Sequence, residues 1–338
     1  MSEGAASHSD TDAASAIDAV VLWVDGNDPR HRAKLDAHLT ALGRRPISAA
    51  PTRFGSVGEI DYCLTSLLRF APFLRLVHVV TDEQWPALMR QPGASPLLRK
   101  LVRVDHREVF RSYEDCLPSF SSRSIETMLH RVPGLAARFI YLNDDFMLIK
   151  PTNAAMFFDG DRPLLRGRWR VAPERRLTRR MRALWQSWRT AEPPAQRPNA
   201  GDAQAMAARL VGVEGRFFSA AHAPYCLRRD TLAHFFDAHP ELLRQNIEFR
   251  LRDSRQFTTT SLANHLELRG GHAIVESDAR LLYVKPKSQR AVARQLLRAD
   301  TDPQLVFACI QSLDEADAGS QACVLDWLDR TIGRAPPT

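Results

Sequence analysis

A short apolar run that ends in two adjacent carboxylates most constrains how this chain folds. Residues 139–142 are Phe, Ile, Tyr and Leu, and Asn143-Asp144-Asp145 follow them directly. Such a run is typical of a buried strand, and polar residues at its end would stand where open α/β sheets bind ligands. Because unpaired buried carboxylates are costly, a metal ion, an arginine or a substrate hydroxyl is expected beside them. A surface Asn-Asp turn is the alternative that this stretch alone leaves open.

Three further runs repeat the pattern of a buried strand with a polar end. Residues 17–24 are nearly continuously apolar and lead into Asp25-Gly26-Asn27-Asp28-Pro29, while residues 74–80 and 101–106 form similar runs. Helical periodicity over residues 30–42 and 59–70 separates the strands. This rhythm predicts an α/β fold with a Rossmann-like, mostly parallel sheet flanked by helices. Asp28 alone is equally explained as the N-cap of its helix.

The length and charge of the chain limit the classes of protein to which it can belong. With 338 residues and 44% hydrophobic content, the chain can bury a sizeable core. The net charge of +7 favours acidic partners, which include nucleic acid, anionic lipid, a nucleotide-sugar or an anionic polymer. Tryptophans on one helical stripe, rather than interleaved along a groove, argue against a nucleic-acid binding module. We therefore expect no nucleic-acid partner.

Cysteine usage and targeting signals suggest a cytoplasmic protein. The five cysteines are odd in number and form no C-x-x-C pair, which indicates neither a zinc site nor a disulfide framework. Residues 1–16 resemble a disordered leader and not a signal peptide. No run approaches the roughly 20 apolar residues of a membrane span. Any membrane contact is thus expected to be peripheral, at an anionic surface, and a homo-oligomer remains open.

An arginine-rich segment interrupts the core. We divide the chain into the leader 1–16, an α/β half 17–160, a basic helical insert or lid 161–215, a second half 216–332 that completes the core, and the tail 333–338. Arginines crowd the first part of the insert, among them Arg166, Arg168, Arg170, Arg175, Arg176, Arg179, Arg180 and Arg182. Met181, Leu184, Trp185 and Trp188 form an apolar stripe at helical spacing. That helix would either pack on the core as a lid or rest on an anionic membrane or polymer.

Several motifs together resemble the Stealth family. Residues 17–29 (I-D-A-V-V-L-W-V-D-G-N-D-P) are similar to its first signature region, and residues 117–135 and 138–146 are similar to its second. Residues 222–225 (H-A-P-Y), with the arginines after them, resemble the third region, and residues 307–313 more faintly the fourth. The combination is long and follows the family's order.

The resemblance implies a GT-A-like fold and a sugar-1-phosphate transferase. In this reaction a glycan hydroxyl attacks the β-phosphorus of a UDP-sugar, which gives a phosphodiester and UMP, in capsule or exopolysaccharide synthesis. Mg²⁺ (or Mn²⁺) is the implied cofactor. A metal-dependent GT-A-type glycosyltransferase that releases UDP is the alternative.

The same resemblance suggests roles for individual residues. It implies that Glu126 and Asp145 act at the reacting centre, with His222 as proton acceptor or phosphate partner and Arg252 as a charge clamp. Asp144 and Asp145 are the expected metal ligands. The expected substrate-binding residues are Asp25, Gly26, Asn27, Asp28, Arg123, His130, Asn143 and Arg250. Local helix electrostatics alone would also explain Glu126 and His130.

Five residues, in three stretches of the chain, depart from the family pattern. Asp61 stands where many members have arginine. Ser121 stands in the place of an Asn, and Arg123 in the place of a His or Asn. Gln311-Ser312 replaces an Asn-Asp pair. These changes concern donor and acceptor choice more than the reaction class. We hypothesise that Arg123 takes over phosphate binding from the missing arginine.

Overall fold

The computed structural model describes residues 16–49, 55, 57–90, 95–175 and 199–334. The strands are β1 (Ile17–Leu22), β2 (Val77–Thr81), β3 (Leu101–Asp105), β4 (Arg138–Asn143), β5 (Phe146–Leu148), β6 (Phe158–Asp159), β7 (Arg162–Val171), β8 (Arg216–Ala220), β9 (Tyr225–Arg228), β10 (Ile274–Glu276), β11 (Leu281–Val284) and β12 (Phe307–Ile310). The α-helices are α2 (Pro29–Leu42), α3 (Glu59–Phe70), α4 (His106–Val109), α5 (Ser122–Met128), α7 (Ala200–Leu210), α8 (Arg229–Ala238), α9 (Pro240–Ile247), α10 (Thr259–Gly270), α11 (Gln289–Thr301) and α12 (Ala318–Thr331).

A central sheet in the order β3-β2-β1-β4-β9 organises the molecule. The pairs β2–β3, β1–β2 and β1–β4 are parallel, and only β9 is antiparallel to its neighbour β4. Each of the four parallel strands begins within a few residues of its predicted run. The predicted mostly parallel sheet flanked by helices is confirmed.

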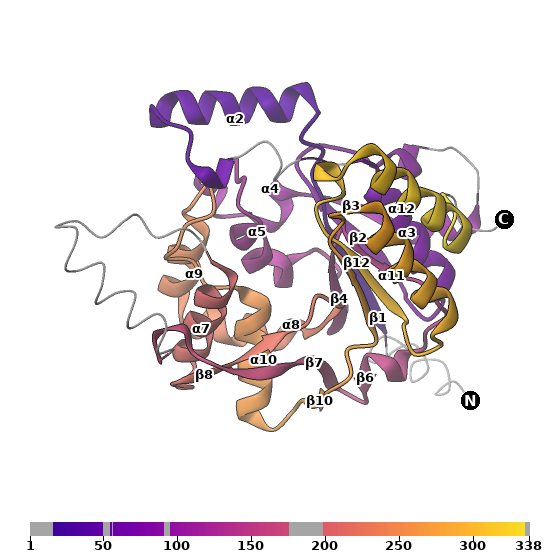
Figure 1. Cartoon of the computed structure of the whole chain (residues 1–338). Coiled ribbons are helices and arrows are strands. Elements are labelled where there is room, and N and C mark those ends of the chain that lie inside the picture. The colour runs from indigo at the N-terminus through magenta and orange to yellow at the C-terminus, as the bar shows by residue number, and fades with distance from the viewer. Residues whose placement is uncertain (1–15, 50–54, 56, 91–94, 176–198, 335–338) are drawn as a thin grey trace, which may run out of the picture.

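Both faces of this sheet are covered, which explains why its strands are apolar throughout. On β1, Ala19 and Val21 face a core with α3, α11 and α12, while Val20 and Leu22 face a core with α5 and α7 to α10. Figure 1 shows these two groups of helices on opposite sides of the sheet. A strand buried on both faces has no reason to alternate with polar residues.

Two smaller sheets extend the core. The sheet β11-β12-β5 joins the C-terminal half to β5, which directly follows β4. The third sheet has the order β10-β7-β6, with β8 paired to β7. Segments from before and after the arginine-rich region thus interleave in space. In the described ranges, no helix has the length and apolar composition needed to cross a membrane.

The predicted helical insert needs correction. Arg166, Arg168 and Arg170 lie on β7, so the first part of this segment is a strand paired with β8 and not a helix. The predicted stripe of Met181, Leu184, Trp185 and Trp188 lies outside the described residues, as does nearly all of the predicted leader. A strand is reasonable here because Pro163 and Val171 disfavour a helix. As a strand, β7 forms backbone hydrogen bonds with neighbouring strands on both of its edges.

The buried carboxylate of Asp18 holds the other end of the sheet together. Arg75 donates two hydrogen bonds to it, at 2.9 and 2.6 Å, and His78 Nε2 lies 3.1 Å away. The backbone N–H groups of Leu76 and Ala136 donate to the same carboxylate at 3.2 and 2.9 Å. Burial acts to raise the pKa of Asp18, but the hydrogen bonds from Arg75 and His78 outweigh it and hold this pKa below its usual value. Asp18 therefore ties β1 to the segments that enter β2 and β4.

We expect Asp18→Asn to lower the free energy of unfolding by about 3 kcal/mol at pH 7, because it leaves buried donors without a charged acceptor. A lowered pKa contributes stability above the unfolded-state value of about 4, and this is lost as the pH falls through the folded-state value. The difference in unfolding free energy between wild type and Asp18→Asn should therefore become smaller in acid. Urea unfolding at pH 7 and at pH 3 measures this difference in the free energy of unfolding, with the exposed Asp36→Asn as control. Equal stability of wild type and Asp18→Asn at pH 7 would contradict this account.

Candidate active site

A cleft of about 610 Å³ opens at the carboxyl ends of the parallel strands. Its walls come from the segment after β1, the β4–β5 turn, the start of α5 and the residues after β12. Among the residues that line the cleft are His31, Glu59, His106, Ser122, Asn143, Asp144, Asp145, Arg252, Lys285 and Gln311. A cavity of this size is in the range of small-molecule sites. The predicted position of the site at this edge of the sheet agrees with the structure.

Asp145 lies in a tight turn between β4 and β5 and is fixed from β12. Its backbone carbonyl accepts a hydrogen bond from the N–H of Ile310 at 3.0 Å, and its Oδ2 accepts one from Cys309 Sγ at 3.7 Å. Its Oδ1 is buried and accepts no hydrogen bond within the described part of the chain. Burial raises the pKa of Asp145 to about 6, against the lowering effect of the Cys309 hydrogen bond. One oxygen is thus held in place and the other is available to a ligand.

Two more carboxylates share this wall of the cleft. Burial, together with the charges of Asp145 and Glu59, raises the pKa of Asp144 well above its usual value. Glu59, in the first turn of α3, is buried and accepts a hydrogen bond from the N–H of Val57 at 2.7 Å. Sequence reasoning missed Glu59, since an acidic residue in the first helical turn is common for local reasons.

Glu126 and Arg252 meet through Ser122. Arg252 Nε and Nη2 donate to Ser122 Oγ at 3.2 and 2.5 Å. Burial raises the pKa of Glu126, while the charges of Arg252 and Arg123 and the nearby hydroxyls of Ser122 and Tyr141 act in the opposite direction. Glu126 thus lies beside a guanidinium that lines the cleft.

Asn143 joins this group through Tyr141. The Tyr141 hydroxyl donates to Asn143 Oδ1 at 2.7 Å, and Asn143 lines the cleft. Asn143 is therefore the only one of the eight predicted substrate-binding residues among the residues that line the described cleft. Tyr141 was not singled out from the sequence, where it reads as part of the apolar strand.

His222 packs close to the turn between β4 and β5. It follows β8, and its ring centroid lies 6.3 Å from that of Phe146 and 5.3 Å from that of Tyr283. Phe146 directly follows Asp145, so the histidine is close to the carboxylate turn. Its packing lowers the pKa of His222, which favours the neutral ring. Asp145 and Arg252 therefore line one cleft, while Glu126 lies beside Arg252 and His222 lies near the β4–β5 turn.

The loop after β1 has a structural role that the sequence did not favour. Asp28 caps α2 by accepting from the N–H groups of Arg30 and His31, and Asp25 accepts from the N–H of Asn27. Arg32 donates to the carbonyl of Gly26 and to Asn27 Oδ1. Asp25, Gly26, Asn27 and Asp28 therefore bond mainly to each other and to α2, and none of them lines the cleft.

Two predicted substrate-binding arginines are committed to backbone carbonyls. Arg123 is buried and donates to the carbonyls of Asn199, Asp253 and Gln256. Arg250 donates to the carbonyls of Asp115 and Pro118. The prediction that Arg123 binds phosphate is wrong, because its guanidinium supports the loop that presents Arg252. Arg250 likewise holds the segment before α5.

His130 is also structural. Its Nδ1 lies 3.0 Å from the carbonyl oxygen of Thr127, and its ring packs on Phe236 with a centroid distance of 5.4 Å. Burial lowers the pKa of His130 to about 4. These contacts hold His130 in the packing between the helices, and its predicted role in substrate binding stays a prediction.

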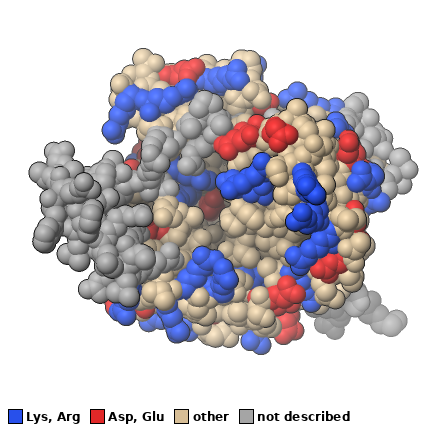
Figure 2. Space-filling model, in the orientation of Figure 1, with Lys and Arg blue, Asp and Glu red and all other residues tan. Residues whose placement is uncertain are grey.

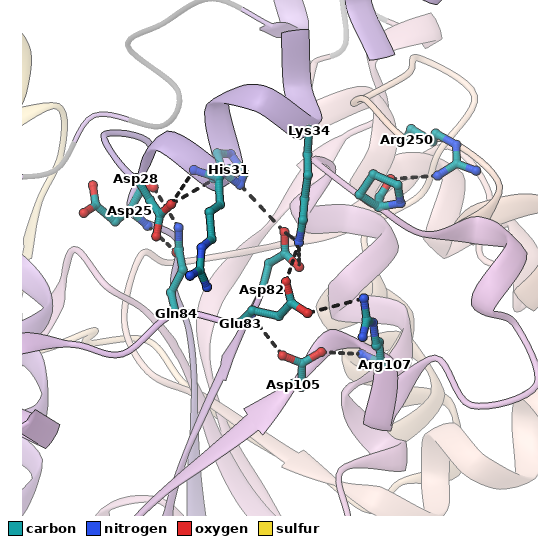
Figure 3. A network of polar contacts seen from close by, with 12 residues as sticks. Asp25, Asp28, His31, Lys34, Asp82, Glu83, Gln84, Asp105, Arg107 and Arg250 are labelled. Atoms are coloured by element: carbon teal, nitrogen blue, oxygen red, sulfur yellow. Dashed lines mark hydrogen bonds and ion pairs between the residues drawn. The ribbon is translucent and has the colours of Figure 1, made fainter. Parts of the chain in front are cut away.

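An ionic network fastens α2 across the ends of β2 and β3, as Figure 3 shows. Lys34 donates to Asp82 at 2.9 Å and to Glu83 at 3.0 Å, and His31 Nδ1 lies 4.0 Å from Asp82. The Glu83 N–H donates to Asp105 at 2.9 Å. The network brings His31 to the wall of the cleft beside the buried His106, whose pKa burial lowers to about 4.

Comparison with known proteins identifies the family. Residues 16–43 match conserved region 1 of the Stealth proteins, and residues 53–164 match conserved region 2. The chain belongs to the Stealth family. An exopolysaccharide phosphotransferase of Streptomyces coelicolor is 34% identical over 84% of the chain and 46% of that protein.

Other Stealth relatives carry similar names. The capsular polysaccharide phosphotransferase WcwK of Streptococcus pneumoniae is 37% identical over 43% of the chain and 42% of that protein. The exopolysaccharide phosphotransferase CpsY of Mycobacterium tuberculosis is 27% identical over 93% of the chain and 56% of that protein. This Stealth chain spans about half the length of these curated relatives.

Two solved structures were also found to be similar. The galactosyltransferase LgtC aligns with 93% of the chain and 96% of its own length, at 10% identity and a TM-score of 0.42. Mouse xyloside xylosyltransferase 1 aligns with 87% of the chain and 97% of its own length, at 12% identity and a TM-score of 0.35.

In the metal-free protein, we expect the Asp145 carboxyl carbon to titrate near pH 6 in an NMR experiment. Cys309→Ala removes a hydrogen bond that favours the carboxylate, so the midpoint should move to higher pH. Cys63→Ala is the matched control, since that thiol contacts the carbonyl of Asn143 and not the Asp145 side chain. A midpoint near pH 4, or the same midpoint in Cys309→Ala, would contradict the assignment.

Proposed function

We propose that this Stealth protein transfers a sugar-1-phosphate from a UDP-sugar to a glycan hydroxyl, in capsule or exopolysaccharide synthesis. The transfer forms a phosphodiester and releases UMP. The observation that carries the proposal is that Asp145 and Arg252 line one cleft, with Glu126 beside Arg252. The names of its relatives, which are exopolysaccharide and capsular polysaccharide phosphotransferases, support the same reaction class.

The proposed step needs a base and charge stabilisation. The acceptor oxygen forms a bond to the β-phosphorus, the bond from this phosphorus to the α–β bridging oxygen breaks, and UMP leaves with that electron pair. The hydroxyl proton passes to a side chain. With a pKa near 6, Asp145 is ionised at neutral pH yet more basic than an ordinary aspartate. Glu126 and the neutral ring of His222 are the other acceptors within the site.

Arg252 supplies the positive charge. Phosphoryl transfer depends mostly on positioning and on neutralising the non-bridging oxygens, which an arginine does well. The two hydrogen bonds from Arg252 to Ser122 hold the guanidinium in place before substrate binds. Arg123 and Arg250 contribute indirectly, because they anchor the loops on either side.

The cleft also suits a divalent cation. Asp144 and Asp145 offer hard oxygen ligands, and Asp145 Oδ1 is a buried oxygen without a donor among the described residues. Within the described chain, no three His, Cys, Asp or Glu side chains are close enough to hold a metal ion alone. Mg²⁺ commonly takes only one or two carboxylates and completes its shell with phosphates and water. Bound there by Asp144 and Asp145, Mg²⁺ or Mn²⁺ would neutralise phosphate charge.

Asp145→Asn and Glu126→Gln should each lower kcat by about 10²-fold or more, since they remove a proton acceptor or ligand at the reacting centre. Transfer is measured with a panel of UDP-sugars, a glycan acceptor and Mg²⁺, and products are identified by mass spectrometry. Unchanged circular dichroism and melting temperature would show that the fold is intact. Asp326→Asn, an exposed carboxylate on α12, is the control. Full activity in either site variant would remove that residue from the chemical step.

The fate of the β-phosphorus tests the reaction class. With UDP-sugar labelled at the β-phosphate, we expect the label to move to the glycan and unlabelled UMP to appear. A glycosyltransferase would leave the label in UDP, because it breaks the bond at the sugar carbon. Label found only in UDP would refute the phosphotransferase and support the alternative.

A further inference from the structure

A band of positive charge runs from the cleft along one helix. Along β11 and the residues after it, Leu282, Val284 and Pro286 are buried, whereas Tyr283, Lys285 and Lys287 are exposed. Three arginines follow on α11 at intervals of four residues. We call Lys285, Lys287, Arg290, Arg294 and Arg298 the α11 band. Figure 2 shows Lys and Arg side chains gathered on the part of the surface where Figure 1 draws α11.

The side chains of the α11 band face away from the protein core, and little of their charge is neutralised by ion pairs. The apolar side of α11, with Val292, Leu296 and Ala299, is buried in the core shared with α12. Arg298 pairs with Asp302 at 3.6 Å. The other four cations have no ion-pair partner in the described part of the chain. This concentration of charge is therefore available to an anionic ligand.

The band is continuous with the candidate active site. Lys285 lines the cleft, and so does Gln311, whose Oε1 accepts a hydrogen bond from the hydroxyl of Tyr283. The ring of Tyr283 packs against His222, and Gln295 of α11 donates to the carbonyl of Tyr283 at 3.2 Å. A chain leaving the cleft would pass this aromatic pair and then reach the arginines.

We propose that the α11 band binds the acceptor, and that the acceptor is a glycan that already carries phosphodiester groups. This inference rests on the proposed function, in which each transfer adds one negatively charged phosphodiester to the product. Arg290 to Arg298 spans about 12 Å along the helix, at roughly 1.5 Å per residue. Such spacing suits an extended polyanion better than a single small anion. Tyr283 and His222 offer apolar ring faces to the sugars at the cleft's edge.

A membrane surface fits these observations less well. A helix that lies on a membrane buries an apolar face in the lipid. The apolar face of α11 is occupied by the protein core, and on its basic side the large apolar side chain is Leu297, which is 63% exposed. Anionic vesicles are therefore the competing ligand in the test.

The direct test is binding of the full chain to a fluorescent poly(glycerol phosphate) oligomer, followed by anisotropy at low and high salt. We expect binding that weakens with salt, with no binding of a neutral dextran of similar length. The double variant Arg290→Ser/Arg294→Ser should bind about tenfold more weakly and show a shallower salt dependence, since fewer ion contacts are made. Arg330→Ser, an exposed arginine on α12, is the matched control.

Three results would overturn the inference. The first is equal affinity of the double variant and the wild type for the oligomer. The second is equal loss of affinity in Arg330→Ser, which would mean that net charge alone matters. The third is binding to phosphatidylglycerol vesicles that depends on Arg290 and Arg294 while oligomer binding does not.

A transfer assay separates this inference from the proposed function. With β-labelled donor, the double variant should raise KM for a phosphodiester-containing acceptor relative to a neutral one, with kcat on that acceptor unchanged. If label reaches both acceptors equally well in wild type and variant, the acceptor inference fails and the phosphotransferase stands. If label reaches neither acceptor in the wild type, the proposed function fails, and the oligomer binding assay still decides whether the band takes a polyanion.

Discussion

The cost of burying carboxylates at the end of a strand governs this structure. Asp144 and Asp145 lie in the turn that joins β4 to β5, where burial and mutual repulsion disfavour their charged forms. The fold holds them there because β12 pairs with β5 and bonds the backbone of Asp145 through Ile310. A segment from the C-terminal half is thus required to keep the N-terminal half's carboxylates in place.

Asp18 shows what the same chemistry does when it serves stability. Its carboxylate is also buried, but Arg75, His78 and two backbone N–H groups surround it, and its pKa is lowered. Asp145 receives a thiol hydrogen bond on one oxygen, and its pKa is raised. The oxygens of Asp18 are therefore occupied by hydrogen bonds within the protein, while Asp145 keeps one oxygen available to a ligand. This contrast is a physical reason to place chemistry at the carboxyl end of the sheet and structural support at the other.

The cationic residues divide in the same way. The guanidinium groups of Arg123 and Arg250 donate to backbone carbonyls, whereas Arg252 lines the cleft. All three looked alike in a sequence with many arginines. The three arginines differ in role because Arg123 and Arg250 meet backbone carbonyls that need a hydrogen-bond donor. Which carbonyls these are depends on how residues 249–257 fold over α5. The band on α11 is another consequence, because packing one face of that helix on α12 leaves its arginines outside.

From the order of residues alone, the strands, their polar ends and the position of the cleft could be inferred, since doubly buried strands must be continuously apolar and parallel strands bring their ends together. The roles of Glu126, Asp145 and Arg252 were predicted from the family motifs. Tertiary packing decided the rest: that His130 and Arg123 are internal supports, that Glu59 joins the carboxylates, and that Lys285 borders the cleft. These roles depend on contacts between residues far apart in the chain, where hydrogen-bond partners and burial, rather than residue type, determine what a side chain does.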